Sequence, residues 1–494
     1  MRHVLAIDQG TTGSTCLVIR SDGEVVGRGY REIAQHYPQP GWVEHDAEEI
    51  FDSTCEAARE AIAMSKVTPD VIGITNQRET IVVWDRATGR PVRRAIVWQD
   101  RRTAARCLEL APRAEEISRR TGLVIDPYFS GTKLEWMLRE TPGLAARATA
   151  GDVAAGTIDA YLVWRLTGGK VHATDPTNAS RTMLYDIDRL AWSDELCGLF
   201  GVPRAMLPDV RPSAGDFGTT TKDHFGVELP IRGVVGDQQS ALYGQGCWEK
   251  GEGKNTYGTG AFLLFNAGAA RPNSGGGLLT TIACDARGNP AYALEAAVFI
   301  AGAAIQWLRD GLQIIANAGE SEAMARSLPS NEGVYFVPAL VGLAAPHWDP
   351  NARGTIVGLT RGTGRAHLVR AALESMAYST ADVVDSARTF GRVAVERLRV
   401  DGGATANDWL MQFQADVLGI PVERPSMLET TALGAAGLAG IAHGVWASPE
   451  EFLAARHFTR FTPGAGGTDA AAGREGWRRA VRATLGWSRD GRTG

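Results

Sequence analysis

The sequence has little of what marks several large classes of protein. Its six cysteines, in 494 residues, include no C-x-x-C pair and none beside paired histidines, which argues against a zinc site and a disulfide framework. We expect these cysteines to be reduced core residues. Charges of both signs are interspersed and the net charge is only −5, so no basic stripe indicates a nucleic-acid partner.

Long hydrophobic runs are missing as well. The first apolar segment, residues 4–7, is interrupted by Asp8 and is too short for a signal peptide. The small-residue run 433–442 stops at His443, well short of the length that spans a membrane. We therefore expect no membrane insertion and a cytoplasmic location.

No proline- or serine-rich linker divides the chain, although its length exceeds a single hydrophobic core. A chain of 494 residues suggests two large domains or more. Hydrophobic residues make up 44% and charged residues 22%, which is ordinary for a globular protein and excludes a disordered one. The 58 glycines are clustered, and the clusters mark turns between elements.

A strand–turn–strand pattern with a glycine- and threonine-rich turn occurs twice, at residues 4–19 and 254–265. Both patterns predict β-hairpins. Glycine lets backbone amides approach a polyphosphate, threonine adds hydroxyl donors, and the carboxylate of Asp8 can hold the water shell of Mg²⁺. Two such tips could hold one phosphate chain between them. The alternative is that glycine simply turns two unrelated hairpins.

Two further polar turns follow apolar segments. Residues 231–235 lead into Asp237, and a carboxylate at the C-terminal end of a strand lies where ligands bind in α/β sheets. Residues 398–400 lead through Gly402 and Gly403 to Asn407 and a helical pattern. Glycines there allow a base or ribose to approach the backbone, although a double glycine before a helix often serves packing alone. The alternation of strands and helices predicts α/β layers.

The order of these pieces resembles the actin-like ATPase superfamily and, within it, the FGGY family of carbohydrate kinases. Residues 128–137 and 354–374 resemble the two signature segments of that family. Four further segments are similar to the branch of the family that phosphorylates glycerol: residues 41–46, 72–80, 178–184 and 301–308. The similarity covers nearly the whole chain and fades after about residue 442.

This resemblance implies an α/β fold of two actin-like (ribonuclease H-like) domains with an ATP and substrate cleft between them. The N-terminal domain, residues 1–245, would carry the glycerol site, the first phosphate hairpin and the catalytic carboxylate. The C-terminal domain, residues 246–494, would carry the second hairpin and the adenosine site. The implied activity is ATP-dependent phosphorylation of glycerol to sn-glycerol 3-phosphate, with Mg²⁺, by a homo-oligomer, either a dimer or a tetramer.

The resemblance also implies the site residues. Glycerol has three hydroxyls on a small skeleton, so a selective pocket needs fixed polar groups and apolar walls. The implied hydrogen-bonding residues are Arg78, Glu79, Tyr128, Asp237 and Gln238, and the implied walls are Trp98 and Phe262. The implied nucleotide-binding residues are Thr11, Thr12, Gly13, Thr259, Gly302, Gln306, Gly403 and Asn407, and the implied magnesium ligands are Asp8 and Asp237.

Asp237 is also the candidate general base. The alcohol must lose a proton as the γ-phosphoryl group moves, and a carboxylate within hydrogen-bonding distance can accept it. Each site residue has a structural alternative: Arg78 and Glu79 could form a surface ion pair, and Trp98 or Phe262 could belong to the core.

One position departs from the glycerol-phosphorylating relatives. Many of them carry an arginine where this chain has Thr15, so a planar, permanently charged donor is missing here. Either another cation, such as Lys254 or Arg78, compensates for it, or the enzyme is slower and holds its phosphorylated product less tightly. We expect compensation, because the other recognised elements are present.

Two other functions are weighed against glycerol phosphorylation. A sister kinase for another polyol or a pentulose would share both hairpins and the adenosine turn, but should lack the combination of Arg78–Glu79, Trp98 and Phe262. A non-catalytic actin-like ATPase scaffold is less favoured, because both candidate catalytic carboxylates, Asp8 and Asp237, are present.

Overall fold

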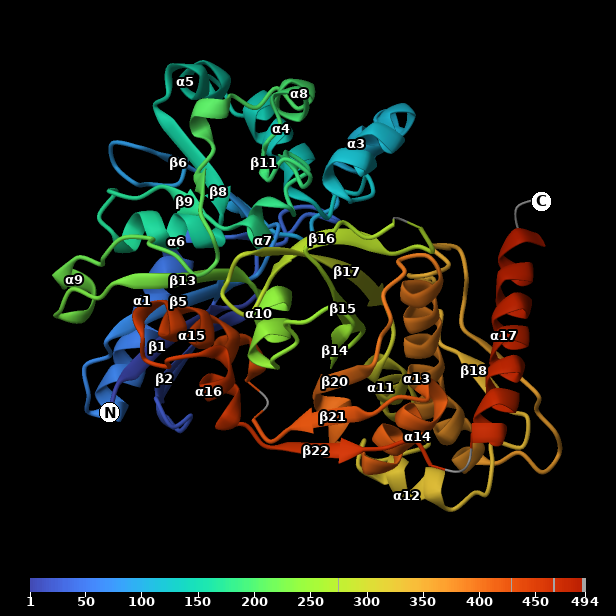
Figure 1. Cartoon of the computed structure of the whole chain (residues 1–494). Helices are drawn as coiled ribbons and strands as arrows, with labels where there is room; N and C mark the ends of the chain where they lie inside the picture. Colours follow the sequence, from blue (N-terminus) through green and yellow to red (C-terminus); the bar gives the residue numbers. More distant parts are fainter. Residues whose placement is uncertain (274, 428, 465–466, 491–494) are drawn as a thin grey trace.

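The computed structural model describes residues 1–273, 275–427, 429–464 and 467–490. For residues 467–469, 471 and 490 it describes the backbone alone. Two large sheets organise the chain, one in each half of the sequence (Figure 1). The strands of the first sheet, in spatial order, are β13 (Ile231–Gly236), β5 (Val71–Asn76), β1 (His3–Gln9), β2 (Gly13–Arg20) and β3 (Val25–Glu32).

The second sheet repeats the plan of the first. The strands of the second sheet, in spatial order, are β16 (Leu279–Cys284), β17 (Pro290–Val298), β15 (Ala261–Gly268), β14 (Glu252–Tyr257), β20 (Arg397–Gly402), β21 (Val422–Pro425) and β22 (Phe458–Phe461). In each sheet an antiparallel hairpin, β1–β2 or β14–β15, is extended by a parallel strand, β5 or β20. Both predicted hairpins are therefore confirmed.

A third sheet extends the N-terminal half, in the upper part of Figure 1. Its strands are β4 (Glu44–His45), β7 (Ala95–Ile96), β6 (Ile81–Asp85) and β8 (Val153–Thr157). Short two-stranded pairs are β10 (Tyr185–Asp186) with β11 (Ala191–Trp192), β9 (Ala173–Thr174) with β12 (Asp209–Val210), and β18 (Tyr335–Val337) with β19 (Thr355–Val357).

Helices cover the sheets. Those of the N-terminal half are α1 (Ala47–Ser65), α2 (Ala104–Glu109), α3 (Ala114–Thr121), α4 (Ser130–Glu140), α5 (Leu144–Ala150), α6 (Ile158–Leu166), α7 (Pro176–Ala179), α8 (Asp194–Leu199), α9 (Lys222–Phe225) and α10 (Asp237–Gly244). Those of the C-terminal half are α11 (Gly302–Asp310), α12 (Glu320–Arg326), α13 (Arg365–Thr389), α14 (Asp408–Leu418), α15 (Thr430–His443), α16 (Pro449–Ala454) and α17 (Gly467–Asp490). Within the described residues, no helix has the length and apolarity needed to cross a membrane.

The first sheet is buried on both faces because two helices from distant parts of the sequence cover it. Helix α1 packs on β2 and β3, and α15 returns from the C-terminal half to pack on β1, β5 and β13 (Figure 1). The contact with α15 is close, since a Cβ at Gly73 would lie 2.1 Å from the carbonyl oxygen of Ala435. Glycine is therefore required at this point of β5. Strands covered on both faces have continuous apolar runs, as residues 4–7 of β1 and 71–74 of β5 do.

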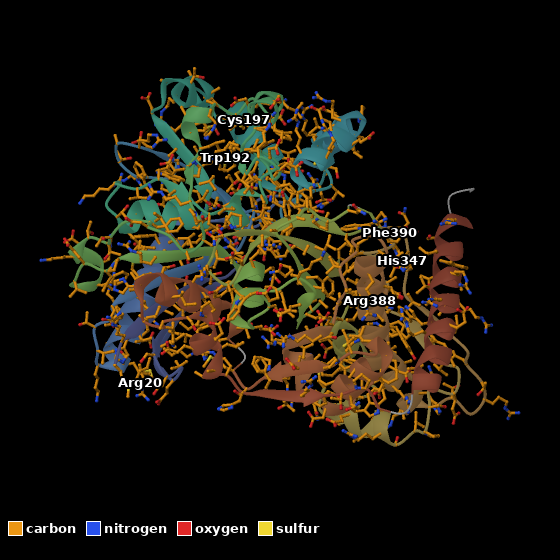
Figure 2. The ribbon with its side chains drawn as sticks, viewed as in Figure 1. Arg20, Trp192, Cys197, His347, Arg388 and Phe390 are labelled. Carbon is orange, nitrogen blue, oxygen red and sulfur yellow. The ribbon has the colours of Figure 1, made fainter. Side chains whose placement is uncertain are left out.

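Side chains fill the space between these layers (Figure 2). Cys197 and Trp192 lie together in the core of the upper part of the molecule. All six cysteines are buried free thiols, as expected from the sequence.

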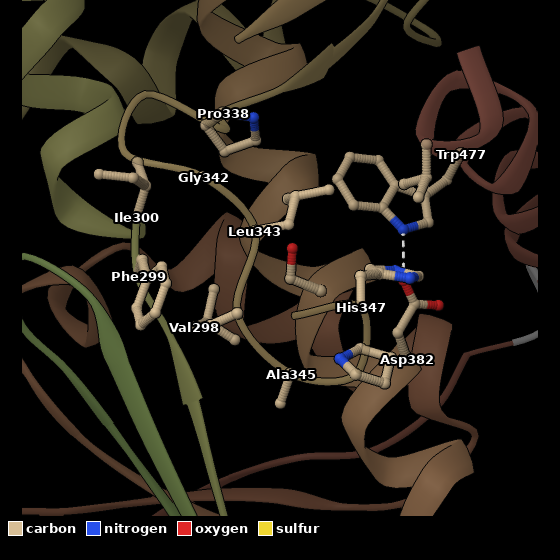
Figure 3. A pocket seen from close by; sticks show the side chains of 14 residues that line it. Val298, Phe299, Ile300, Pro338, Gly342, Leu343, Ala345, His347, Asp382 and Trp477 are labelled. Atoms are coloured by element: carbon tan, nitrogen blue, oxygen red, sulfur yellow. Dashed lines mark hydrogen bonds between the residues drawn. The ribbon is translucent and has the colours of Figure 1, made fainter. Parts of the chain in front are cut away.

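Helix α17 is held against α13 by an indole hydrogen bond. Trp477 Nε1 donates to Asp382 Oδ2 at 2.7 Å, drawn as a dashed line in Figure 3, and the Trp477 ring stacks on Tyr378. The cavity beside this contact is small, about 30 Å³, and none of the predicted site residues lines it.

A buried polar network joins the end of β5 to α7. Asn76 and Asn178 exchange side-chain hydrogen bonds of 3.0 and 3.1 Å. Asp175 caps α7 and accepts from Asn178 Nδ2 at 3.0 Å. Asp159 accepts from the Thr174 hydroxyl at 2.6 Å. The network thus fixes the segments 72–80 and 178–184 against each other. Burial, aided by the charge of Asp175, raises the pKa of Asp159 to about 7.

We predict that Asp159→Asn weakens the pH dependence of stability. Because the folded pKa of Asp159 lies above the ordinary value of 3.8, its contribution is complete below pH 3.8 and is lost as the pH rises through about 7. The free energy of unfolding of the wild type should fall between pH 4 and 7 by on the order of 3 kcal/mol more than that of Asp159→Asn. Denaturant unfolding across this range measures the difference.

The exposed Asp209→Asn variant is the control and should follow the wild-type profile. Parallel profiles for the wild type and Asp159→Asn would show that Asp159 is not held neutral in the fold.

Candidate active site

The two candidate metal ligands lie at the C-terminal ends of β1 and β13, which flank β5 in the first sheet. Asp8 lies opposite Thr15 in the β1–β2 ladder and beside Thr75 of β5. Burial, and then the neighbouring charge of Asp237, raises the pKa of Asp8 to about 7. Two carboxylates that repel each other are stabilised by a cation between them.

The donor set of this pair fits Mg²⁺. Within the described residues no group of three or more His, Cys, Asp or Glu side chains could enclose a metal. Mg²⁺ keeps several water ligands and commonly binds through one or two carboxylates plus substrate phosphates. Asp8 and Asp237 are such a pair.

Asp237 is the first residue of α10 and remains accessible. Its side chain is 30% exposed, and its Oδ1 lies 3.3 Å from Nε of Arg78. Oδ1 also accepts from the backbone N–H of Gln238 at 2.7 Å. The partial loss of solvent around Asp237 raises its pKa, and the positive charge of Arg78 opposes the rise. Gly236 makes this arrangement possible, because a Cβ there would lie 2.8 Å from Arg78 Cδ.

Arg78 and Glu79 lie in the loop after β5 and are buried, so the surface ion pair is excluded. Glu79 has a φ of 61°, a left-handed conformation that is uncommon for a side chain other than glycine. The Ser130 hydroxyl donates to the carbonyl oxygen of Glu79 at 2.9 Å and holds this conformation. Backbone strain of this kind is frequent at functional sites.

The guanidinium of Arg78 is fixed from three sides. Nη1 donates to Gln239 Oε1 at 3.1 Å and to Glu295 Oε2 at 2.7 Å. Nη2 donates to Glu295 Oε1 at 3.1 Å and to the Tyr128 hydroxyl at 3.4 Å. Arg78, Tyr128 and Asp237, three of the predicted substrate residues, therefore lie together.

The two predicted aromatic wall residues lie in different halves of the chain, Trp98 beside Tyr128 and Phe262 on β15. Trp98 meets Tyr128 edge to face with ring centroids 5.5 Å apart, and Trp98 Nε1 donates to the Thr11 hydroxyl at 2.9 Å. Phe262 is half-buried on β15, opposite Ala297 of β17. The hydroxyl of Thr11 thus already has a protein partner, which connects the first hairpin to the aromatic wall.

Gln238 is bonded to a buried cation of the second sheet. Lys254 Nζ donates to Gln238 Oε1 at 2.5 Å and to the Thr256 hydroxyl at 2.8 Å. Burial lowers the pKa of Lys254 to about 8, and the charges of Asp401 and Asp237 oppose this shift. Lys254 therefore places positive charge near Asp237, and its compensation for Thr15 stays a prediction.

Two charged residues of the cluster were missed by the sequence prediction. Arg181 Nε donates to Glu79 Oε1 at 2.6 Å, and Arg181 Nη2 donates to Glu295 Oε1 at 2.8 Å. Although burial would raise it, Arg181 and Arg78 lower the pKa of Glu295 to about 2. Arg181 lies in the segment 178–184 that the family resemblance singled out. Glu295 carried no sequence signal, because its place depends on strand register.

The second hairpin borders an open cavity of about 490 Å³. Thr259, Gly302, Gln306, Gly403 and Asn407 are among its lining residues. The tip of the hairpin rests on the start of α11, where the amide of Gly302 donates to Gly258 at 3.0 Å. Asn407 also caps α14, since its Oδ1 accepts from the amide of Leu410 at 2.9 Å. Five predicted nucleotide residues thus surround one cavity.

The remaining predicted nucleotide residues lie on the first hairpin. Thr11 and Thr12 form its tip, where the amide of Gly10 donates to the carbonyl of Gly13 at 2.9 Å. Gly13 begins β2 and has a packing reason of its own, because a Cβ there would lie 2.4 Å from the Arg31 carbonyl oxygen. Thr11, Thr12 and Gly13 are not among the residues that line the cavity beside the second hairpin.

The repeated plan of the two sheets, a hairpin with a glycine-rich tip extended by parallel strands, is that of the actin-like ATPases. Residues 3–244 match the FGGY family of carbohydrate kinases, N-terminal domain, and residues 253–443 match its C-terminal domain. The chain belongs to this family.

Relatives of known name agree over the whole length. The chain is 54% identical to "Glycerol kinase 2" of Thermotoga maritima over 99% of this chain and 100% of the relative. It is 53% identical to the glycerol kinase of Carboxydothermus hydrogenoformans over 98% of this chain and 99% of the relative.

Solved structures of related kinases also match over nearly the whole chain. The crystal structure of Plasmodium falciparum glycerol kinase with ADP has a TM-score of 0.94 at 36% identity and covers 98% of both chains. Xylulose kinase from Rhodospirillum rubrum has a TM-score of 0.89 at 23% identity over 99% of this chain and 100% of its own, which shows the shared fold alone.

We predict that Gly403→Val weakens nucleotide binding without unfolding the protein. Gly403 lines the cavity, and a Cβ there would meet no atom within 4 Å, so the larger side chain fills space that a nucleotide would need. The Kd for ADP, measured by calorimetry, should rise by about tenfold. Gly198→Val is the matched control, because Gly198 is exposed on α8 with equally open surroundings. An unchanged Kd in Gly403→Val would place the nucleotide elsewhere.

Proposed function

We propose that this protein transfers the γ-phosphoryl group of ATP to glycerol and forms sn-glycerol 3-phosphate. The observation that carries the proposal is the position of Arg78, whose Nε lies 3.3 Å from the candidate base Asp237 and whose Nη2 lies 3.4 Å from the Tyr128 hydroxyl. Fixed polar groups beside the Trp98 ring suit a small polyol. The sequence identity of 53–54% to two glycerol kinases, over nearly the full length of the chain, supports the same substrate.

In this proposal each side chain has a separate task. Arg78, Glu79, Tyr128 and Gln238 bind and orient the hydroxyls of glycerol, while Trp98 and Phe262 contact its carbons. Asp237 accepts the proton of the attacking hydroxyl. Lys254 adds positive charge next to Asp237, where charge develops during phosphoryl transfer.

Residues from both halves of the chain hold the nucleotide. Thr259, Gly302, Gln306, Gly403 and Asn407 bind the nucleotide in the cavity of the second half, and the tip formed by Thr11, Thr12 and Gly13 supplies donors for the phosphates. Asp8 and Asp237 would hold Mg²⁺, which neutralises phosphate charge when bound. Closure of the two halves would exclude water from the reaction.

Residues 1–245 and 246–494 form the two domains, with α15 packing across this division onto the first sheet. The protein assembles as a homo-oligomer, a dimer or a tetramer, which light scattering after size exclusion measures.

A coupled assay of ADP release tests the function. Glycerol, xylulose, ribulose and no acceptor are compared at equal concentrations with MgATP. ADP release that depends on glycerol is the expected result. Faster release with a pentulose would identify a sister kinase, and equal release without acceptor would indicate an ATPase of another kind.

We predict that Asp237→Asn abolishes most turnover while the fold is retained. The amide is nearly isosteric with the carboxylate but cannot accept the proton, and the loss of a general base typically lowers the rate by about 10²–10⁴-fold. Steady-state kinetics with glycerol and MgATP measure this loss. Asp22→Asn, a change in an exposed ion pair remote from the site, is the control and should leave kcat unaltered. Near-normal turnover of Asp237→Asn would remove Asp237 from this role.

A further inference from the structure

Four buried charges form a closed cluster beside Asp237. The cations Arg78 and Arg181 alternate with the anions Glu79 and Glu295, and the side chains of all four are at most 4% exposed. Glu295 accepts from both arginines, at 2.7 Å from Arg78 and 2.8 Å from Arg181. It is therefore the one member of the four that contacts both cations through hydrogen bonds shorter than 3 Å.

Glu295 comes from the other half of the chain. Arg78 follows β5 and Arg181 follows α7, whereas Glu295 lies on β17, in the second sheet. Figure 1 shows β17 crossing the middle of the molecule between the two halves. Glu295 stands opposite Leu264, two residues along β15 from Phe262, so Glu295 and Phe262 share one face of the sheet. The substrate site is thus completed by a carboxylate from the second sheet.

The hydrogen bonds of Arg78 leave one donor free. Its four Nη hydrogens face Gln239, Tyr128 and both oxygens of Glu295. Its Nε–H is buried and has no hydrogen-bond partner among the described residues. Asp237 Oδ1 at 3.3 Å and Glu79 Oε1 at 3.6 Å lie near Nε. A hydroxyl placed beside Nε, next to both carboxylates, could accept from Nε–H and donate to one of the two carboxylates.

We propose that Glu295 is a positioning residue for the substrate. Glu295 accepts from both Nη groups of Arg78 and so keeps these two groups, the fork of the guanidinium, turned away from Asp237. The Nε–H of Arg78 then remains available for one hydroxyl of the polyol. This inference rests on the proposed function, since it concerns how the same site recognises glycerol.

Removal of the Glu295 charge has a specific consequence. Arginine pairs best with a carboxylate through two parallel N–H bonds, and Asp237 is the nearest accessible carboxylate. Without Glu295 the Arg78 fork can turn onto Asp237, occupy the place of the hydroxyl and engage the base. The loss falls on the recognition of one hydroxyl and not on nucleotide binding.

The test compares Glu295→Gln with Glu423→Gln as the matched control. Glu423 is also a buried carboxylate of the second sheet paired with an arginine, Arg399 at 3.1 Å, but it lies on β21, away from the substrate residues. The kcat and KM are measured for glycerol, for 1,2-propanediol and for 1,3-propanediol, which each lack one hydroxyl, and for ATP.

In Glu295→Gln the KM for glycerol should rise by about tenfold or more, with the KM for ATP within about twofold of the wild type. The preference in kcat/KM for glycerol over one of the two diols should fall by at least about tenfold, because the hydroxyl that Nε serves is no longer recognised. Glu423→Gln should keep the preference of the wild type.

Equal losses for glycerol and both diols in Glu295→Gln would overturn the positioning role. If Glu295→Gln does not fold, Glu295→Asp, which keeps the charge with a shorter reach, takes its place, and an unchanged preference there also overturns the role. A wild type that does not phosphorylate glycerol overturns the proposed function and this inference together, whereas an active wild type with an unchanged preference in the variants overturns the inference alone.

Discussion

The pairing of Arg78 with Glu295 is the interaction on which the rest of the site depends. Burying a guanidinium or a carboxylate alone costs several kcal/mol, and only a partner with good hydrogen-bond geometry offsets that cost. Arg78 and Arg181 would be two unpaired buried cations without Glu79 and Glu295. Because the partners come from different sheets, the two halves must pack together before these charges can be buried.

The repeated sheet plan explains why the functional groups converge. In each sheet the glycine-rich tip of a hairpin lies beside the C-terminal end of a parallel strand, where ligands bind in α/β sheets. The first sheet places Asp8 and Asp237 at the same edge, on strands separated by β5, and the second places Lys254 and Glu295 on one face. Helix α15 packs on one face of the first sheet. Its close approach at Gly73 limits the movement of the strands that carry the carboxylates.

Aromatic and hydroxyl contacts connect the proposed substrate residues with the proposed phosphate residues. The Trp98 indole holds the Thr11 hydroxyl at the hairpin tip and packs against Tyr128, which in turn contacts Arg78. The paired amides of Asn76 and Asn178 fix the loop before Arg78, and Ser130 holds the strained backbone of Glu79. These positions are determined by packing around them, so the site is preorganised.

Local patterns of apolar, glycine and hydroxyl residues were enough to predict both hairpins and the strand that leads into Asp237. Family resemblance added the five residues that line one cavity, and it added Arg78, Trp98 and Tyr128, which the structure brings together. The place of Glu295 and its pairing with both arginines became visible in the folded chain alone. That pairing depends on the register of β17 against β15 and on the contact between two sheets. Neither can be predicted from a short segment of the sequence, because both bring together residues that are far apart in the chain.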